Sequence, residues 1–85
     1  MAKTFRLEIV TPERLVFSDE IVSLVVPAYE GYLGVLAGHA PLLCTLEKGR
    51  IEVKKDKGGQ DFKTSGGFME VTPQKTIILA DSMAS

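Results

Sequence analysis

The chain has 85 residues, 45% hydrophobic and 25% charged, a composition typical of one small globular domain over residues 1–85 and unlike that of a disordered segment. Its 10 Lys and Arg against 11 Asp and Glu give a net charge of -1, which argues against nucleic acid or anionic lipid as a partner. The single cysteine and the absence of a long apolar segment argue against a disulfide framework and a membrane span, and predict a soluble chain in a reducing cytoplasm.

The first half of the chain predicts short strands separated by turns. Residues 5–9 read Phe-Arg-Leu-Glu-Ile, which places apolar side chains on one face of a strand that Thr11-Pro12 ends. Further strands are expected at 14–17, 20–26, 32–36 and 42–46, all rich in β-branched, aromatic or leucine residues. The turns expected between them are Ser18-Asp19, Pro27, and Gly38 with Pro41.

The second half continues the same pattern. Strands are expected at 50–54, 60–64, 67–71 and 75–80. The turns expected around them are Gly49, Gly58-Gly59, Ser65-Gly66-Gly67 and Pro73, and the lysines at 54, 55 and 57 are interpreted as the solvated tip of a hairpin. No window shows a sustained helical period with caps. About nine or ten short strands predict an all-β fold, a sandwich or a flattened barrel.

Several of the expected strands are apolar on both faces. In 20–26, Val22, Leu24 and Val26 form one wholly apolar face, and the opposite face carries further apolar side chains. The segments 42–44 and 77–79 behave in the same way. A thin domain of two layers has few places to bury both sides of several strands, and contiguous exposed apolar area usually marks an interface. The sequence therefore predicts a protein that docks on a partner.

The stretch from Gly31 to His39 invites a chemical interpretation, because it holds three glycines and the only histidine. Its pattern G-x-x-G-x-x-x-G-H matches neither the dinucleotide fingerprint nor the phosphate loop, and both need a following helix that Ala40-Pro41 disfavours. We therefore interpret the glycines as positions of turns or of close backbone approach.

His39 and Cys44 are the candidates for metal or nucleophile chemistry. Zinc needs three or four converging ligands, and two do not make a site. A nucleophile and base pair lacks an evident third group or oxyanion donor. We therefore expect no catalytic, metal or cofactor site. Two alternatives stay open, a free-standing small-molecule-binding β-barrel that uses the glycine-rich turn and a cysteine-dependent enzyme.

Three segments carry a resemblance to a known family: VVPAYEGYLGVLAGHAPLL (25–43), SGGFMEV (65–71) and TIILAD (76–81). They strongly resemble the N-terminal β-sandwich of the epsilon subunit of F-type ATP synthases, in order and spacing over nearly the whole chain. The resemblance implies a ten-stranded sandwich that acts as a noncatalytic rotor part at the foot of the central stalk. It also implies docking on the gamma subunit and the c-ring, peripheral to the cytoplasmic side of the bacterial plasma membrane, in coupling proton flow to ATP synthesis.

The resemblance also assigns interface residues. Glu30, Gly31 and Tyr32 match a turn that faces the c-ring, and Thr11, His39 and Cys44 match positions near gamma. From the residues alone, Tyr32 could equally cap the sandwich and Cys44 could be a small core residue. The family's C-terminal helical hairpin is absent from this sequence, so ATP binding and inhibition by that hairpin are not expected of these residues.

Overall fold

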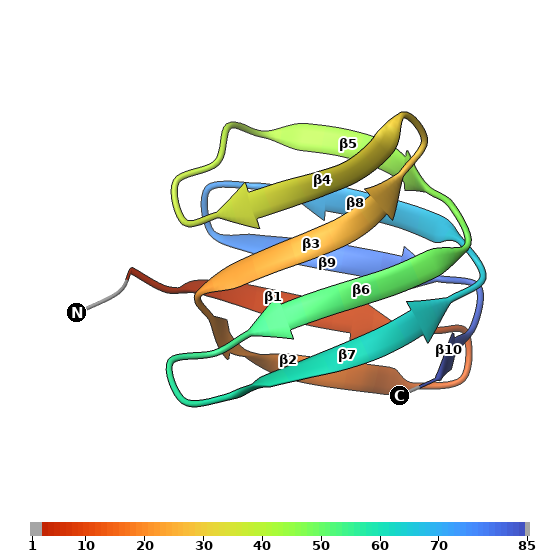
Figure 1. Cartoon of the computed structure of the whole chain (residues 1–85), viewed down its shortest axis with the longest axis horizontal. Coiled ribbons are helices and arrows are strands. Elements are labelled where there is room, and N and C mark those ends of the chain that lie inside the picture. Colours follow the sequence, from red (N-terminus) through yellow and green to blue (C-terminus); the bar gives the residue numbers. More distant parts are fainter. Residues whose placement is uncertain (1–2, 85) are drawn as a thin grey trace.

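The structure, a computed structural model, describes residues 3–84 and contains strands but no helix in that range (Figure 1). The strands are β1 (Phe5–Val10), β2 (Leu15–Ile21), β3 (Ser23–Ala28), β4 (Gly31–Leu36), β5 (Leu42–Leu46), β6 (Gly49–Lys54), β7 (Gly59–Thr64), β8 (Gly67–Val71), β9 (Lys75–Ala80) and β10 (Met83–Ala84). The predicted all-β fold is therefore confirmed. From β4 to β9, every expected strand appears with its limits moved by no more than about one residue.

The strands form two packed layers. The front layer contains β4, β3, β6, β7 and β10 in that order, and the back layer contains β5, β8, β9, β1 and β2. Figure 1 shows the front layer crossing over the back layer. The two layers are joined through the pair Ala28–Leu46, where β3 meets β5. Paired strands run antiparallel except β1 and β9, which run parallel. This is the flattened sandwich that was expected.

The core lies between the layers, and most of the strands contribute alternate residues to it. Ile9, Ile78 and Met69 follow one another across β1, β9 and β8, and each is 0% exposed. A fully buried side chain of this size stabilises the fold by roughly 1.5–3 kcal/mol. One cluster of buried hydrophobic side chains fills the space between the layers, which disfavours the alternative of a ligand-binding barrel.

The expected single strand over 20–26 is wrong, because the chain bends at Val22. β2 ends in the back layer before the bend, and β3 begins in the front layer after it. The bend shifts the alternation of side chains, so that Ile21 and Leu24 are both 0% exposed. The apolar surplus of this segment therefore faces the core, and the exposed apolar surface lies elsewhere.

Ser18 and Asp19 lie inside β2 and do not form the expected turn. β2 is an edge strand, and the Asp19 carboxylate lies 3.2 Å from Lys55 Nζ at the β6–β7 turn. The Glu20 backbone N–H donates to the same carboxylate at 2.7 Å. This backbone hydrogen bond is the main reason why the pKa of Asp19 lies below its ordinary value, and the hydrogen bond from Lys55 is the second. A charge on an edge strand discourages pairing with foreign strands, which gives polar residues a role in β2.

Pro27, expected as a turn residue, lies inside β3 opposite Tyr32 of β4. Its carbonyl accepts a hydrogen bond of 2.7 Å from the Glu47 N–H. In an extended strand, the nitrogen and the carbonyl of one residue point to the same side. The missing N–H of Pro27 therefore faces the β5–β6 turn and costs the β3–β4 ladder nothing.

Gly67 lets three strands of the back layer approach closely. It lies opposite Leu46 of β5 and Ala80 of β9. Its φ is +148°, and a Cβ at this position would lie 2.1 Å from the Leu79 carbonyl oxygen. Since no side chain fits without moving β9, glycine is required here.

Candidate interaction surface

His39 and Cys44 lack the arrangement of an active site. The His39 ring nitrogen Nδ1 lies 2.7 Å from the Ala40 carbonyl oxygen, and Cys44 packs against the core cluster. Burial raises the pKa of the Cys44 thiol, whereas a nucleophilic cysteine needs a lowered pKa. Among residues 3–84, no group of three or more His, Cys, Asp or Glu side chains could hold a metal ion.

The glycine-rich stretch forms a strand and a turn. Gly31 begins β4, and the His39 N–H donates to the Leu36 carbonyl at 3.1 Å across the turn at Ala37–Gly38. No helix follows in the part of the chain that the structure describes, so no helix N-terminus is available there for a phosphate. The interpretation of these glycines as turn and strand positions is confirmed.

Thr11, His39 and Cys44 do not cluster. Thr11 is 9% exposed in the β1–β2 turn, where its N–H donates to the Arg14 carbonyl at 2.9 Å. The pairings through β8 and β9 make β5 run in the same direction as β1. His39, just before β5, and Thr11, just after β1, therefore lie at opposite ends of the back layer. Cys44 lies between them and faces inward.

Glu30, Gly31 and Tyr32 lie together at one end of the sandwich, although they do not form a single turn. The two-residue turn is Tyr29–Glu30, and Gly31 and Tyr32 belong to β4. The side chains of Tyr29 and Tyr32 are 77% and 64% exposed. Large aromatic side chains on an exposed hairpin suit contact with another protein.

The outer face of the back layer carries an exposed apolar patch. We call the set of Leu15, Leu43, Phe68 and Leu79 the outer apolar patch. Phe68 lies opposite Leu79, Leu79 lies opposite Val10, and Val10 lies opposite Leu15. Leu43 is 71% exposed, and the other three are each 54% exposed. Leu43 lies on the same outer face, on β5 opposite Glu70. Exposed apolar side chains gathered on one face are typical of a protein interface.

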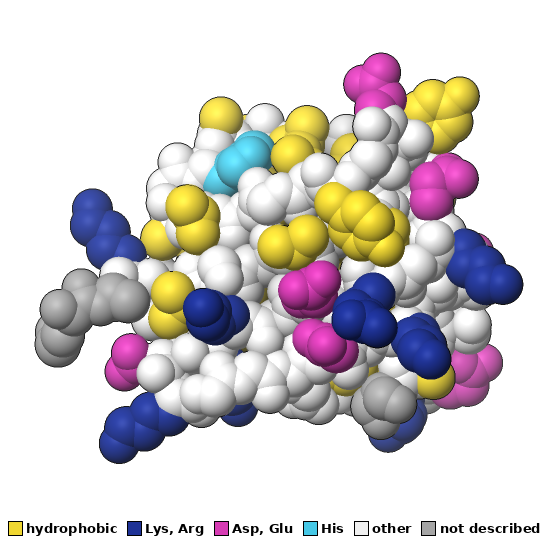
Figure 2. All heavy atoms as spheres, viewed as in Figure 1, with side chains coloured by type: hydrophobic (Ala, Val, Ile, Leu, Met, Phe, Trp, Pro, Cys, Tyr) yellow, Lys and Arg dark blue, Asp and Glu magenta, His cyan; other side chains and the backbone are white. Residues whose placement is uncertain are grey.

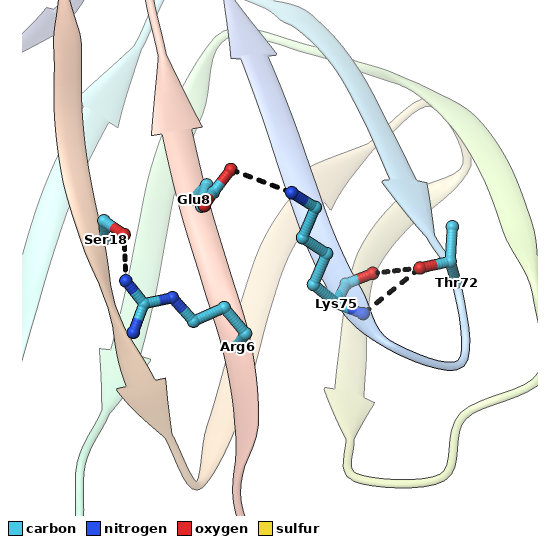
Figure 3. Close-up of polar contacts among 5 residues, drawn as sticks. All are labelled: Arg6, Glu8, Ser18, Thr72 and Lys75. Atoms are coloured by element: carbon cyan, nitrogen blue, oxygen red, sulfur yellow. Dashed lines mark hydrogen bonds and ion pairs between the residues drawn. The ribbon is translucent and has the colours of Figure 1, made fainter.

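The other end of the same outer face is polar, and its groups contact one another (Figure 3). Lys75 Nζ lies 3.3 Å from a Glu8 carboxylate oxygen, and the Arg6 guanidinium donates to the Ser18 hydroxyl. The Thr72 hydroxyl donates to the Lys75 carbonyl at 2.8 Å and accepts from the Lys75 N–H at 3.1 Å. Exposed pairs contribute little stability. These contacts nevertheless give each polar group a partner within the chain. The side chains of the outer apolar patch are exposed instead.

The outer face of the front layer is charged over β6 and β7. Figure 2 shows dark blue and magenta side chains gathered there, with yellow side chains over β3 and β4. Arg50 lies opposite Lys63, and Glu52 lies opposite Asp61. Each of these cross-strand pairs brings two like charges together.

Within residues 3–84 there is no helix with the length and apolar character that crossing a bilayer requires.

The sequence of the chain matches one protein family and individual proteins of that family. The family described as ATP synthase, Delta/Epsilon chain, beta-sandwich domain matches residues 4–85. The ATP synthase epsilon chain of Desulforamulus reducens is 51% identical over 84 residues, and that of Brucella anthropi is 45% identical over 83 residues. Each match covers 96% of this chain, which spans 62% of the length of each relative.

Solved structures share the fold. A chain of the Euglena gracilis mitochondrial ATP synthase (OSCP/F1/c-ring) superimposes with a TM-score of 0.90 at 24% identity, covering 95% of this chain and 52% of that one. A chain of the Tetrahymena thermophila mitochondrial ATP synthase (central stalk/c-ring) gives 0.82 at 14% identity, covering 99% and 68%. At these identities the likeness concerns the fold alone. The family model matches almost the whole sequence. The chain therefore belongs to the ATP synthase delta/epsilon family and corresponds to its β-sandwich domain.

Proposed function

We propose that the chain is the β-sandwich of a noncatalytic rotor subunit of a proton-translocating F-type ATP synthase. In this proposal it lies in the central stalk, binds the gamma subunit and the c-ring, and passes the rotation of the ring to gamma for ATP synthesis. It is peripheral to the cytoplasmic side of the bacterial plasma membrane and needs no cofactor. Membership of the delta/epsilon family and the epsilon-chain relatives support this assignment.

The observation that carries the proposal is the outer apolar patch. Its four side chains are each more than half exposed in the chain alone. Covering the exposed part of such a side chain is worth roughly 1 kcal/mol, half of the value for full burial. The patch therefore gives a gamma subunit a favourable docking surface, provided that the gain exceeds the entropy cost of association.

We extend the proposed gamma contact to the expected gamma residues. Thr11 shares a shallow hollow of about 320 Å³ with Phe68 and Leu79. His39 lies beyond the opposite end of the layer, and Cys44 supports β5 from the core side. We assign Thr11 and His39 to the two ends of the gamma contact and Cys44 to its support.

The proposed c-ring contact lies at the end of the sandwich that carries the β3–β4 turn. Glu30, Gly31 and Tyr32 are all exposed there. A rotor part needs two separate surfaces, one for the shaft and one for the ring. The back-layer face and this end provide two such surfaces on different parts of the domain.

A binding experiment with purified gamma tests the proposal. The variant F68S/L79S removes half of the outer apolar patch, and we expect it to weaken gamma binding by at least about tenfold, because two central apolar contacts are lost. The matched control is Leu36→Ser, which changes a leucine that is 62% exposed on β4 of the front layer. Titration calorimetry measures both affinities, and circular dichroism checks folding.

Two results would overturn the proposal. The wild-type chain could fail to bind gamma, or the double variant and the Leu36→Ser control could bind gamma equally well. ATP-driven proton pumping by a reconstituted synthase gives a second readout. We expect pumping to fall with F68S/L79S and to stay unchanged with the control.

A further inference from the structure

Three cations surround one hollow on the front layer. Lys48, Arg50 and Lys63 line a depression of about 500 Å³, together with Tyr32, Gly49, Glu52 and Thr64. All three cationic residues are exposed. In the described range, the two ion pairs are Lys55–Asp19 and Lys75–Glu8, so none of these three cations forms an ion pair there.

The register of β6 and β7 makes this arrangement unfavourable for the chain alone. Arg50 lies directly opposite Lys63. Like charges directly opposite each other destabilise an antiparallel pair, whereas opposite charges stabilise it. Glu52, which also lines the hollow, faces Asp61, so that two negative charges repel each other there. A feature that weakens the isolated fold is typical of a binding surface.

Tyr32 closes one side of the hollow. It starts on β4 and reaches across Pro27 of β3 to β6, since a Cβ on Gly49 would lie 3.2 Å from the Tyr32 hydroxyl and 2.8 Å from Pro27 Cβ. Glycine at position 49 thus leaves room for the phenol beside Arg50. The hollow therefore combines three cations and the Glu52 carboxylate with the side chain of Tyr32.

We propose that this hollow binds a carboxylate-bearing loop of a protein partner, the c-ring in the proposed function, on which this inference rests. The Arg50 guanidinium can bind a carboxylate with two parallel hydrogen bonds, and Lys48 and Lys63 supply further positive charge. The aromatic ring provides apolar contact for the peptide around that carboxylate.

The distribution of charge favours a protein loop over a lipid surface. Lipid recognition by electrostatics uses clusters of about four to eight basic residues. Here, three cations stand beside Glu52 and Asp61 in a chain whose net charge is -1. The hollow also lies near the β3–β4 turn, at the end assigned to the ring, because Tyr32, the second residue of β4, lines it.

The test compares two double variants with the same change in charge. R50Q/K63Q neutralises the hollow, and the matched control K54Q/K57Q neutralises two lysines nearer the tip of the same hairpin. We expect R50Q/K63Q to weaken binding to purified c-rings by about tenfold and to reduce the dependence of that affinity on salt. Gamma binding should stay unchanged in both variants. Removing the repulsion should not lower the melting temperature, which keeps misfolding from explaining the loss.

A hexaglutamate peptide provides a readout that is independent of the ring. In NMR titrations it should shift the amide signals of residues 50 and 63 in the wild type and in K54Q/K57Q, but not in R50Q/K63Q. Equal c-ring affinity of the two variants would overturn this inference while leaving gamma binding, and with it the proposed function, intact. If R50Q/K63Q lost binding to vesicles of anionic phosphatidylglycerol but kept its affinity for c-rings, the occupant of the hollow would be a lipid headgroup. That result would overturn the proposal of a protein loop. Failure of the wild type to bind gamma or the ring would overturn the proposed function itself.

Discussion

The outer faces of the two layers differ in how their strands are built. In β6, Arg50 and Glu52 face out while Ile51 and Val53 face the core, so that the strand alternates polar and apolar residues. In β9, Ile78 faces the core and its neighbour Leu79 is 54% exposed on the outside. A strand with a charged outer side is solvated without a partner, whereas a strand that is apolar on both sides is not. The contrast supports the proposal that the back layer docks on an apolar surface.

The largest expected effect comes from removing the glycine beneath the outer apolar patch. We expect Gly67→Ala to lower the free energy of unfolding by more than about 3 kcal/mol, because a Cβ would collide with the Leu79 carbonyl at a strained φ. Urea denaturation measures the change. The control is Gly34→Ala, at which a Cβ would meet nothing within 4 Å. Similar midpoints for the two variants would contradict the close packing of β8 and β9.

Two neighbours on β9 test the difference between inside and outside directly. We expect Ile78→Ala to cost about 3 kcal/mol through the cavity that it leaves, and Leu79→Ala to cost less than about 1 kcal/mol. Their exposed fractions are 0% and 54%. Thermal unfolding of both variants measures the difference. Equal losses would show that Leu79 is part of the core and not of the outer apolar patch.

A smaller change is expected on the charged face. Arg50→Glu turns the repulsion with Lys63 into an attraction and should raise the free energy of unfolding by about 0.5 kcal/mol. High salt should reduce the gain by screening the pair. Denaturation at low and high ionic strength tests this. A destabilised variant would mean that Arg50 contributes to the fold in a way that its exposure does not indicate.

The smallest expected effect concerns the contact between the layers at Asp19. Because the pKa of this carboxyl is lowered in the folded chain, its contribution to stability is present above its ordinary value of 3.8 and is lost as the pH falls through the lower folded-state value. Asp19→Asn removes this contribution. The wild type should therefore melt slightly higher at pH 7, and the two melting temperatures should converge as the pH falls below the lowered folded-state pKa of Asp19. A difference that persists at low pH would contradict this explanation.

A strand could be predicted from the sequence where its own residues alternate between polar and apolar and turn residues bound it. Alternation in 50–54 and in 67–71, bounded by glycines, placed β6 and β8 correctly. The bend at Val22 could not be predicted, because it depends on β2 and β3 belonging to different layers. Pro27 was misplaced for a similar reason. Its carbonyl faces the β5–β6 turn, so a residue that usually ends a strand costs nothing there.

The candidate site was predicted only in outline. An apolar surplus was recognised in 42–44 and 77–79, which supply Leu43 and Leu79. Phe68 was missed, since its strand alternates in a way that does not tell which face is buried. Lys48, Arg50 and Lys63 were missed because only the pairing of β6 with β7 brings them to one hollow.

The parallel pairing of β1 with β9 has a consequence for how the chain is made. β1 joins the back layer along β9, from Arg6 opposite Lys75 to Val10 opposite Leu79, and β2 joins only through β1. The β1–β2 hairpin therefore has no strand to pair with in the back layer until β9 has been translated. Until then the apolar side chains of the hairpin are exposed and can be bound by chaperones. The sandwich can therefore close only after β9 has been synthesised.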